Sequence, residues 1–304
     1  MAILGKEAQD AVRALQHEPF AEKVARSRAW IEEWIDRWDH NVSVSYSGGL
    51  DSTVLLHLVR EIWPDCPAIF ADTGLEYPEI KEQVKHTPNV QTIRPKLTFR
   101  QVLEKCGYPV VSKRVAQYVK EVQHAKGETA TKRLRLTGIA SSGRYSAMGK
   151  IPAKWQYLVD APFKISDRCC YYLKKKPLEE MPHPFVGTRA EESNQRLITL
   201  VQFGVNAYEI ATPHSTPLAY WTEADVWWYI DWFHLPVAKV YLGENPLSRT
   251  GCMFCMFGVH LEKPNRFQVM AITHPQQYDY CINNLGLGEI LDYLGVDYSP
   301  LEPR

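Results

Sequence analysis

The stretch that decides the fold is Ser45-Tyr46-Ser47-Gly48-Gly49-Leu50-Asp51-Ser52-Thr53. The β-branched run before it, residues 41–46, predicts a buried strand, and the apolar run after it, residues 54–62, predicts a packed helix. A tight glycine-rich turn between a strand and a helix points backbone N–H groups and the positive end of the helix dipole at one place. The sequence therefore predicts a phosphate site here, and Asp51 supplies the carboxylate that a metal–phosphate site needs. A glycine-rich hairpin or an ordinary helix cap is the alternative.

The pattern of strand, loop and helix is repeated directly afterwards. Residues 66–72 predict a second strand, and a helix begins near residue 79. Such a repeat predicts a parallel sheet with right-handed crossovers, whose ligands bind at the carboxyl ends of the strands. We therefore expect Asp72 and Thr73 to lie at the same edge of the sheet as the glycine-rich turn.

Other segments have equally clear patterns. Residues 6–38 carry apolar side chains at three- and four-residue steps, which predicts one or two helices, with Lys23, Arg26 and Arg28 on a solvated face. Further predicted elements are a strand at residues 90–95, a strand that opens into a helix at residues 184–196, and helices at residues 99–106, 112–125 and 222–230, the last with a capping box from Thr222 to Asp225. The polar, basic residues 126–154 read as a mobile lid, a basic contact face or a solvated loop.

Composition narrows the class of protein. The chain has 304 residues, of which 45% are hydrophobic, so it can bury a large core. No apolar run is long enough to span a membrane, and no secretory signal is visible. The 35 basic and 35 acidic residues balance, which argues against a nucleic-acid binder that uses its whole surface but not against a local basic face. Seven cysteines, an odd number in a large chain, favour a reducing cytoplasm over a disulfide framework.

Three motifs together resemble one known family. The Ser-Gly-Gly-Leu-Asp-Ser-Thr string resembles the PP-loop of ATP pyrophosphatases and adenylyl-sulfate reductases, the phosphoadenosine phosphosulfate reductase family. Residues 70–79, Phe-Ala-Asp-Thr-Gly-Leu-Glu-Tyr-Pro-Glu, are similar to the second motif, where the strand end holds adenosine. Residues 187–193, Gly-Thr-Arg-Ala-Glu-Glu-Ser, resemble the Gly-x-Arg-x-x-Glu-Ser motif, whose arginine faces the nucleotide. A structural salt bridge is the alternative role for Arg189.

The resemblance implies a fold and a set of site residues. The fold is α/β, a Rossmann-like (adenine nucleotide alpha-hydrolase-like) parallel sheet with helices on both faces, and residues 39–240 form its nucleotide-binding domain. The helices expected from periodicity in residues 1–38 precede this domain, and a C-terminal helical segment in residues 241–304 follows it. The implied catalytic residues are Ser47, Asp51 and Arg189, with Asp51, alone or with Asp72, holding Mg²⁺. The implied nucleotide-binding residues are Ser45, Ser47, Gly48, Gly49, Leu50, Asp51, Ser52, Thr53, Asp72, Thr73, Gly74, Gly187 and Arg189.

Four of the cysteines form two pairs, Cys169-Cys170 and Cys252-x-x-Cys255. Four thiolates in two pairs suit an iron–sulfur cluster or a structural zinc ion. The pairs resemble the cluster motif of adenylyl-sulfate reductases and of DndC- and SspD-type DNA phosphorothioation proteins, which implies a 4Fe–4S cluster on Cys169, Cys170, Cys252 and Cys255. The remaining cysteines, Cys66, Cys106 and Cys281, have no partner spacing, and we expect them to be buried.

The resemblance leaves the reaction open between two enzymes. Reductases of the family attack the sulfur with a cysteine near the C-terminus, in a Glu-Cys-Gly-x-His string, whereas residues 292–304 contain no cysteine. That departure favours an ATP pyrophosphatase, which adenylates a substrate oxygen so that sulfur can displace AMP. The acceptor would be a DNA backbone phosphate, or a tRNA base, with a sulfur donor such as a cysteine desulfurase and other modification proteins as partners. The alternatives are an adenylyl-sulfate reductase that makes sulfite and a non-catalytic nucleotide- and cluster-binding redox module.

Overall fold

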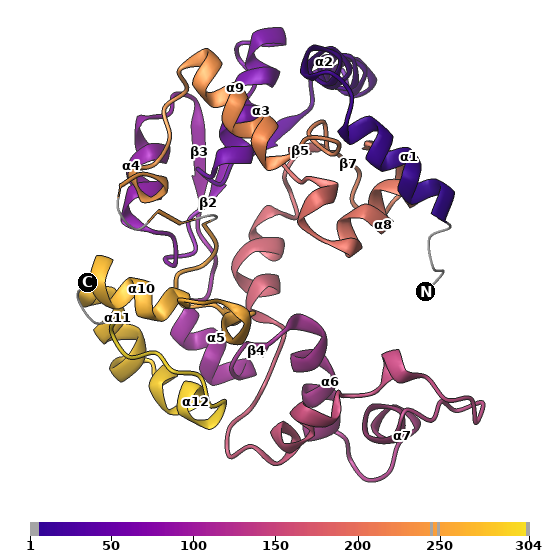
Figure 1. The fold of residues 1–304 in the computed structure, drawn as a ribbon, viewed down its shortest axis with the longest axis vertical. Coiled ribbons are helices and arrows are strands. Elements are labelled where there is room, and N and C mark those ends of the chain that lie inside the picture. The colour runs from indigo at the N-terminus through magenta and orange to yellow at the C-terminus, as the bar shows by residue number, and fades with distance from the viewer. Residues whose placement is uncertain (1–5, 244–245, 248–249, 302–304) are drawn as a thin grey trace. The chain divides into compact units, whose positions relative to one another are not determined.

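The computed structural model describes residues 6–243, 246–247 and 250–301 (Figure 1). The chain forms two compact units, each assembled from separated segments. Unit 1 comprises residues 1–72, 76–93 and 178–250, and unit 2 comprises residues 73–75, 94–177 and 251–304. This division differs from the three consecutive segments expected from the sequence, because the chain passes from unit 1 to unit 2 and back again. Within the described residues, none of the helices combines the length and apolar character that crossing a membrane requires.

A six-stranded sheet, in the order β3-β2-β1-β5-β7-β6, forms the centre of unit 1. Its strands are β1 Ser43–Ser45, β2 Ala68–Ala71, β3 Val90–Ile93, β5 Pro184–Val186, β6 Asn206–Ala207 and β7 His214–Ser215. The central strand β1 pairs in parallel with β2 on one side and with β5 on the other, and β6 pairs antiparallel with β7. Val44 and Phe185, paired across β1 and β5, are fully buried. The predicted α/β class, with a mostly parallel sheet, is confirmed.

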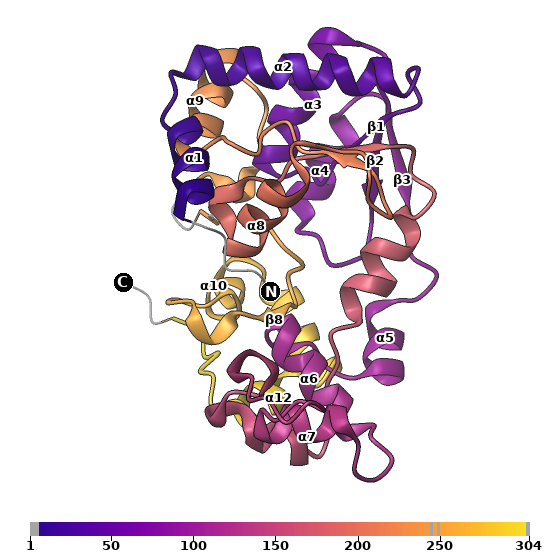
Figure 2. The same ribbon diagram turned by 90° about the vertical axis from the view of Figure 1, so that its right-hand side faces the viewer.

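Helices pack around this sheet. The helices of unit 1 are α1 Lys6–Gln16, α2 Phe20–Arg37, α3 Leu50–Ile62, α4 Pro78–His86, α8 Asn194–Phe203 and α9 Glu223–Phe233. Helix α3 contacts β1 and β5 and also α2 and α9, and Figure 2 shows α2 lengthwise beside α3 and α9. Leu55 and Leu58 of α3 are fully buried, which accounts for the apolar run that follows the glycine-rich turn.

Unit 2 is mostly helical, with one short parallel pair between β4 and β8. Its elements are α5 Phe99–Cys106, β4 Val110–Val111, α6 Lys113–Gln123, α7 Ala130–Thr137, β8 Met256–Phe257, α10 Arg266–Thr273, α11 Pro275–Asp279 and α12 Leu287–Tyr293. The expected loop at residues 126–154 therefore contains a helix. Thr129 caps α7 by accepting the N–H of Lys132, and Gly138 ends it in the left-handed conformation.

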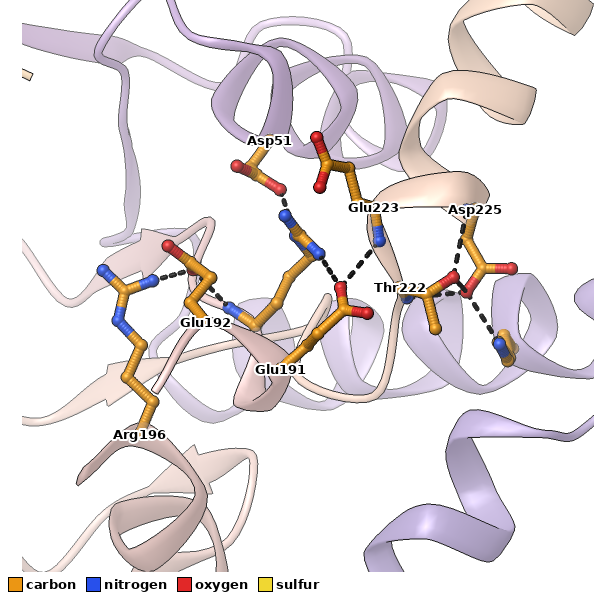
Figure 3. Close-up of polar contacts among 9 residues, drawn as sticks. Asp51, Glu191, Glu192, Arg196, Thr222, Glu223 and Asp225 are labelled. Carbon is orange, nitrogen blue, oxygen red and sulfur yellow. Dashed lines mark hydrogen bonds and ion pairs between the residues drawn. The ribbon is translucent and has the colours of Figure 1, made fainter. Parts of the chain in front are cut away.

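A buried ion pair ties α2 to α9, and it corrects the expectation that Lys23 lies on a solvated face. The Lys23 side chain is 5% exposed, and its Nζ lies 2.7 Å from Oδ2 of Asp225. The same oxygen accepts the backbone N–H of Thr222 and so completes the predicted capping box, which is confirmed (Figure 3).

Lys23→Ala should therefore be strongly destabilising, because it leaves the Asp225 carboxylate without its buried counter-charge. We expect the free energy of unfolding to fall by about 3 kcal/mol in urea titrations. The control, Arg26→Ala, breaks an ion pair with Glu18 in which both side chains are partly exposed, and it should cost less than about 1 kcal/mol. Equal losses for the two variants would contradict the assignment.

Candidate functional site

The glycine-rich turn joins β1 to α3 within unit 1. Gly48 has φ +71°, and a Cβ on it would lie 3.0 Å from Cγ2 of Ile80 on α4, so both conformation and space require glycine. Gly49 is the residue before the first turn of α3, and its own φ of −82° is open to any residue. A thirteen-residue helix, α3, therefore begins directly after this turn. Its N-terminus lies where the sequence predicts an anion site.

The hydroxyl groups of the turn have different tasks. Ser52 Oγ donates to the carbonyl oxygen of Gly49 at 2.9 Å and accepts the backbone N–H of Ser47 at 3.2 Å. Thr53 Oγ1 also donates to the Gly49 carbonyl, at 3.0 Å, and both side chains are buried. Ser52 and Thr53 therefore shape the loop, which leaves Ser47 Oγ, 3.0 Å from Ser52 Oγ, as the more available hydroxyl.

Arg189 is held next to the turn by two carboxylates. Its Nε lies 2.5 Å from Oδ1 of Asp51, and one terminal nitrogen lies 2.5 Å from Oε2 of Glu191. In Figure 3 the carboxylates of Asp51 on α3 and of Glu191 on the segment after β5 face one another. Gly187 permits this approach, because a Cβ on it would lie 3.1 Å from the carbonyl carbon of Asp51. Arg189 therefore forms the salt bridges that were the alternative to a nucleotide contact. It also lies beside the predicted anion site, so the two roles are compatible.

The predicted Mg²⁺ site shares a carboxylate with this arrangement. Oδ1 of Asp51 pairs with Arg189, so a metal ion and the guanidinium would draw on the same side chain. Asp72, at the carboxyl end of β2, forms an ion pair with Lys81 at 3.0 Å. The assignment of Mg²⁺ to these carboxylates stays a prediction.

The remaining predicted nucleotide contacts are distributed along the chain. Ser45 is the last residue of β1, at the same edge of the sheet as Asp72. Thr73 and Gly74 are assigned to unit 2, where Thr73 Oγ1 accepts the N–H of Leu75 at 3.2 Å. Gly74 has φ +79°, which favours glycine. The assignment of these residues to nucleotide binding stays a prediction.

Two residues that the sequence reasoning missed lie against the turn. A Cβ on Gly49 would be 3.1 Å from Oη of Tyr241 and 3.4 Å from Oγ1 of Thr250. Tyr241 is 6% exposed, and burial raises the pKa of its phenol. Both residues come after α9 in the chain, and neither belongs to a recognisable sequence motif, so the sequence gives no signal for them.

The two cysteine pairs both belong to unit 2. Cys169 donates to the sulfur of Cys170 across 4.0 Å, which lowers the pKa of Cys170 to about 6. The same hydrogen bond is the largest cause that raises the pKa of the Cys169 thiol. Burial and the nearby charges of Cys170, Cys255 and Cys252 raise this pKa further. The four sulfur atoms are therefore electrostatic neighbours.

The charged residues around the two cysteine pairs would suit a negatively charged cluster. Lys113 and Lys174 both lower the pKa of Cys170, so cations lie where a thiolate-ligated cluster would place negative charge. Within the described part of the chain, no three His, Cys, Asp or Glu side chains are already arranged to hold a metal ion. The donor set thus suits the 4Fe–4S cluster, which stays a prediction.

The other three cysteines are poor nucleophiles. Cys66 and Cys281 are fully buried, as predicted, and burial raises the pKa of each thiol to about 12. Cys106 is only partly buried, and its pKa is also raised by burial. The described residues therefore present no activated thiolate outside the two cysteine pairs.

Comparison with known proteins identifies the family of the chain. Residues 41–257 match the model of the phosphoadenosine phosphosulfate reductase domain. The chain is 26% identical over 248 residues to the adenosine 5'-phosphosulfate reductase of Staphylococcus haemolyticus, which covers 78% of this chain and 82% of that protein. It is 28% identical over 197 residues to the phosphoadenosine 5'-phosphosulfate reductase of Xanthomonas euvesicatoria, which covers 64% of each chain.

Among solved structures, the phosphate complex of phosphoadenylyl-sulfate reductase from Candida auris matches with a TM-score of 0.39 and 15% identity, over 79% of this chain and 92% of that one. The domain match spans most of the chain and includes the glycine-rich turn, Arg189 and all four paired cysteines. The chain therefore belongs to the family defined by the phosphoadenosine phosphosulfate reductase domain.

Proposed function

We propose that this protein is an adenylyl-sulfate reductase, which binds the nucleotide at the glycine-rich turn of unit 1. The observation that carries the proposal is that one chain combines a glycine-rich turn at the N-terminus of α3 with two cysteine pairs in unit 2. Relatives named adenosine 5'-phosphosulfate reductase support it. The ATP pyrophosphatase, which the absence of a cysteine in residues 292–304 favours, becomes the second candidate.

In this proposal the cradle and Arg189 hold the anionic end of the nucleotide. Backbone N–H groups at the start of α3 would neutralise charge there, and the buried guanidinium of Arg189 would add a planar set of donors. A thiolate then attacks the sulfur atom, the S–O bond to AMP breaks, and AMP leaves with the electron pair. A second thiol attacks the resulting S-sulfonate, so that a disulfide forms and sulfite departs. The attacking thiol would come from a dithiol co-substrate, because Cys66 and Cys281 are buried.

A 4Fe–4S cluster would be held by Cys169, Cys170, Cys252 and Cys255. When bound, it would supply a redox-capable, negatively charged centre to unit 2. Lys113 and Lys174 would balance that charge, since both already act electrostatically on Cys170.

A second candidate is an ATP pyrophosphatase that adenylates a DNA phosphate for sulfur insertion. The observation that favours it is the charge of residues 113–154, which carry ten Lys and Arg residues and two Glu residues in a chain whose 35 basic and 35 acidic residues balance as a whole. Exposed members of this basic segment are Lys113, Arg114, Lys126, Arg133, Arg144 and Lys154. Such a surface suits a polyanion better than a single nucleotide. A cysteine desulfurase would then be the sulfur donor, with other modification proteins as partners.

One assay separates the two candidates. Anaerobically purified protein is given adenylyl sulfate with dithiothreitol, and separately ATP with Mg²⁺ and duplex DNA. We expect sulfite and AMP in equal amounts from the first mixture, and no pyrophosphate from the second. Pyrophosphate release that depends on DNA, without sulfite formation, would establish the second candidate, and neither product would contradict both.

A further inference from the structure

Two hydroxyl groups from the end of unit 1 meet at the glycine-rich turn. Oη of Tyr241 lies 2.6 Å from Oγ1 of Thr250. Both atoms, together with Oγ of Ser47, surround the position that a Cβ on Gly49 would occupy, at 3.1, 3.4 and 3.3 Å. Tyr241 ends the short 3₁₀ helix Lys239–Tyr241, and all four residues belong to unit 1.

A single hydrogen bond joins the two hydroxyls, and either oxygen can be its donor. When the Tyr241 phenol donates to Oγ1 of Thr250, the hydroxyl proton of Thr250 is available to an acceptor outside the pair.

We propose that Thr250 donates its hydroxyl proton to the anionic group bound at the glycine-rich turn, and that Tyr241 is the positioning residue that orients this hydroxyl. The inference rests on the proposed use of the turn as the anion cradle. In this site the anion would be contacted by three sets of groups: the loop backbone with Ser47, the Arg189 guanidinium, and the Thr250 hydroxyl. Gly49 is needed there because a methyl group would occupy the space between the three hydroxyls.

The consequence is selectivity for the anionic part of the ligand. A hydroxyl that donates to a charged oxygen contributes more than one that donates to a neutral group. Thr250 should therefore increase the affinity for adenylyl sulfate and ATP and leave the affinity for adenosine unchanged. A merely structural role for Thr250 would change the affinities for all three ligands together.

The test is calorimetric titration of adenylyl sulfate, ATP and adenosine into the full chain and four variants. Thr250→Val removes the hydroxyl at nearly constant shape, Thr250→Ser keeps it, and Tyr241→Phe removes the group that orients it. The matched control, Tyr208→Phe, removes a phenol in unit 1 that bonds Glu33. Thermal melting checks that every variant is folded.

We expect Thr250→Val to weaken binding of adenylyl sulfate about tenfold with adenosine unchanged, Tyr241→Phe to weaken it several-fold, and the other two variants to resemble the parent protein. Equal binding by Thr250→Val and Thr250→Ser, or a parallel loss for adenosine, would overturn the proposal. Loss of anion affinity in Thr250→Val from a parent protein that makes no sulfite would support this inference and reject the proposed reaction. A parent protein that binds adenosine as tightly as adenylyl sulfate would overturn both.

Discussion

Arg189→Ala is expected to lower turnover at least 100-fold and also to destabilise unit 1. The loss of activity follows because one buried guanidinium donor beside a reacting anion contributes a factor of about 10² to 10³. The loss of stability follows because Asp51 and Glu191, which each lie 2.5 Å from the buried guanidinium, lose their partner. Both carboxylates are partly exposed to water, so we expect the free energy of unfolding to fall by only about 1 kcal/mol in urea titrations.

Two further variants separate the two effects. Arg189→Lys keeps the positive charge but loses the planar fork, so it should recover more stability than activity. Arg26→Ala, which removes an arginine from an exposed ion pair in the same unit, should change neither quantity appreciably. If Arg189→Ala is folded and turns over at the parental rate, the salt bridge is purely structural, and the catalytic assignment is wrong.

Cys255→Ser is expected to remove bound iron and acid-labile sulfide almost completely from anaerobically purified protein. A serine hydroxyl is not a thiolate, and a cluster with three sulfur ligands is far less stable than one with four. The measurement is iron and sulfide content per chain, together with the visible absorption spectrum. The same measurement on the parent protein tests the zinc alternative, because a structural zinc site would show zinc without sulfide.

The control is Cys106→Ser, a partly buried cysteine in the same unit that lies within electrostatic reach of Arg168. It should keep the parental iron and sulfide content. Parental iron in Cys255→Ser, or equal losses in both variants, would contradict the assignment of the four cysteines.

Much of the local structure could be predicted from the sequence because its signals are local. The strand β1, the glycine-rich turn and α3 follow one another within twenty residues, and side-chain periodicity and glycine placement determine each. The capping box at Thr222 depends on a residue three positions later, and it was predicted for the same reason. Helix α7 was missed because its two ends carry polar residues and glycines, which read as a loop without the packing of α6.

The contacts between distant segments could not be predicted. Arg189 and Asp51 are 138 residues apart, and Lys23 and Asp225 are 202 apart, so their pairing depends on which strands and helices become neighbours. The placement of β5 beside β1 brings Gly187 and Arg189 to the start of α3. That strand order reflects the burial of whole elements against one another, which no short motif encodes.

The sequence by itself determined that the chain has an α/β fold with a glycine-rich turn between β1 and α3, and that four of its cysteines form two pairs. The backbone conformation of glycine and the alternation of apolar residues are local properties, so the motifs carry them in full. Only the tertiary structure decided that Asp51 is bound to Arg189 and that Tyr241 and Thr250 close the turn around Gly49. Those contacts join segments that are far apart in the chain, and they exist because packing of the sheet and its helices brings these segments together.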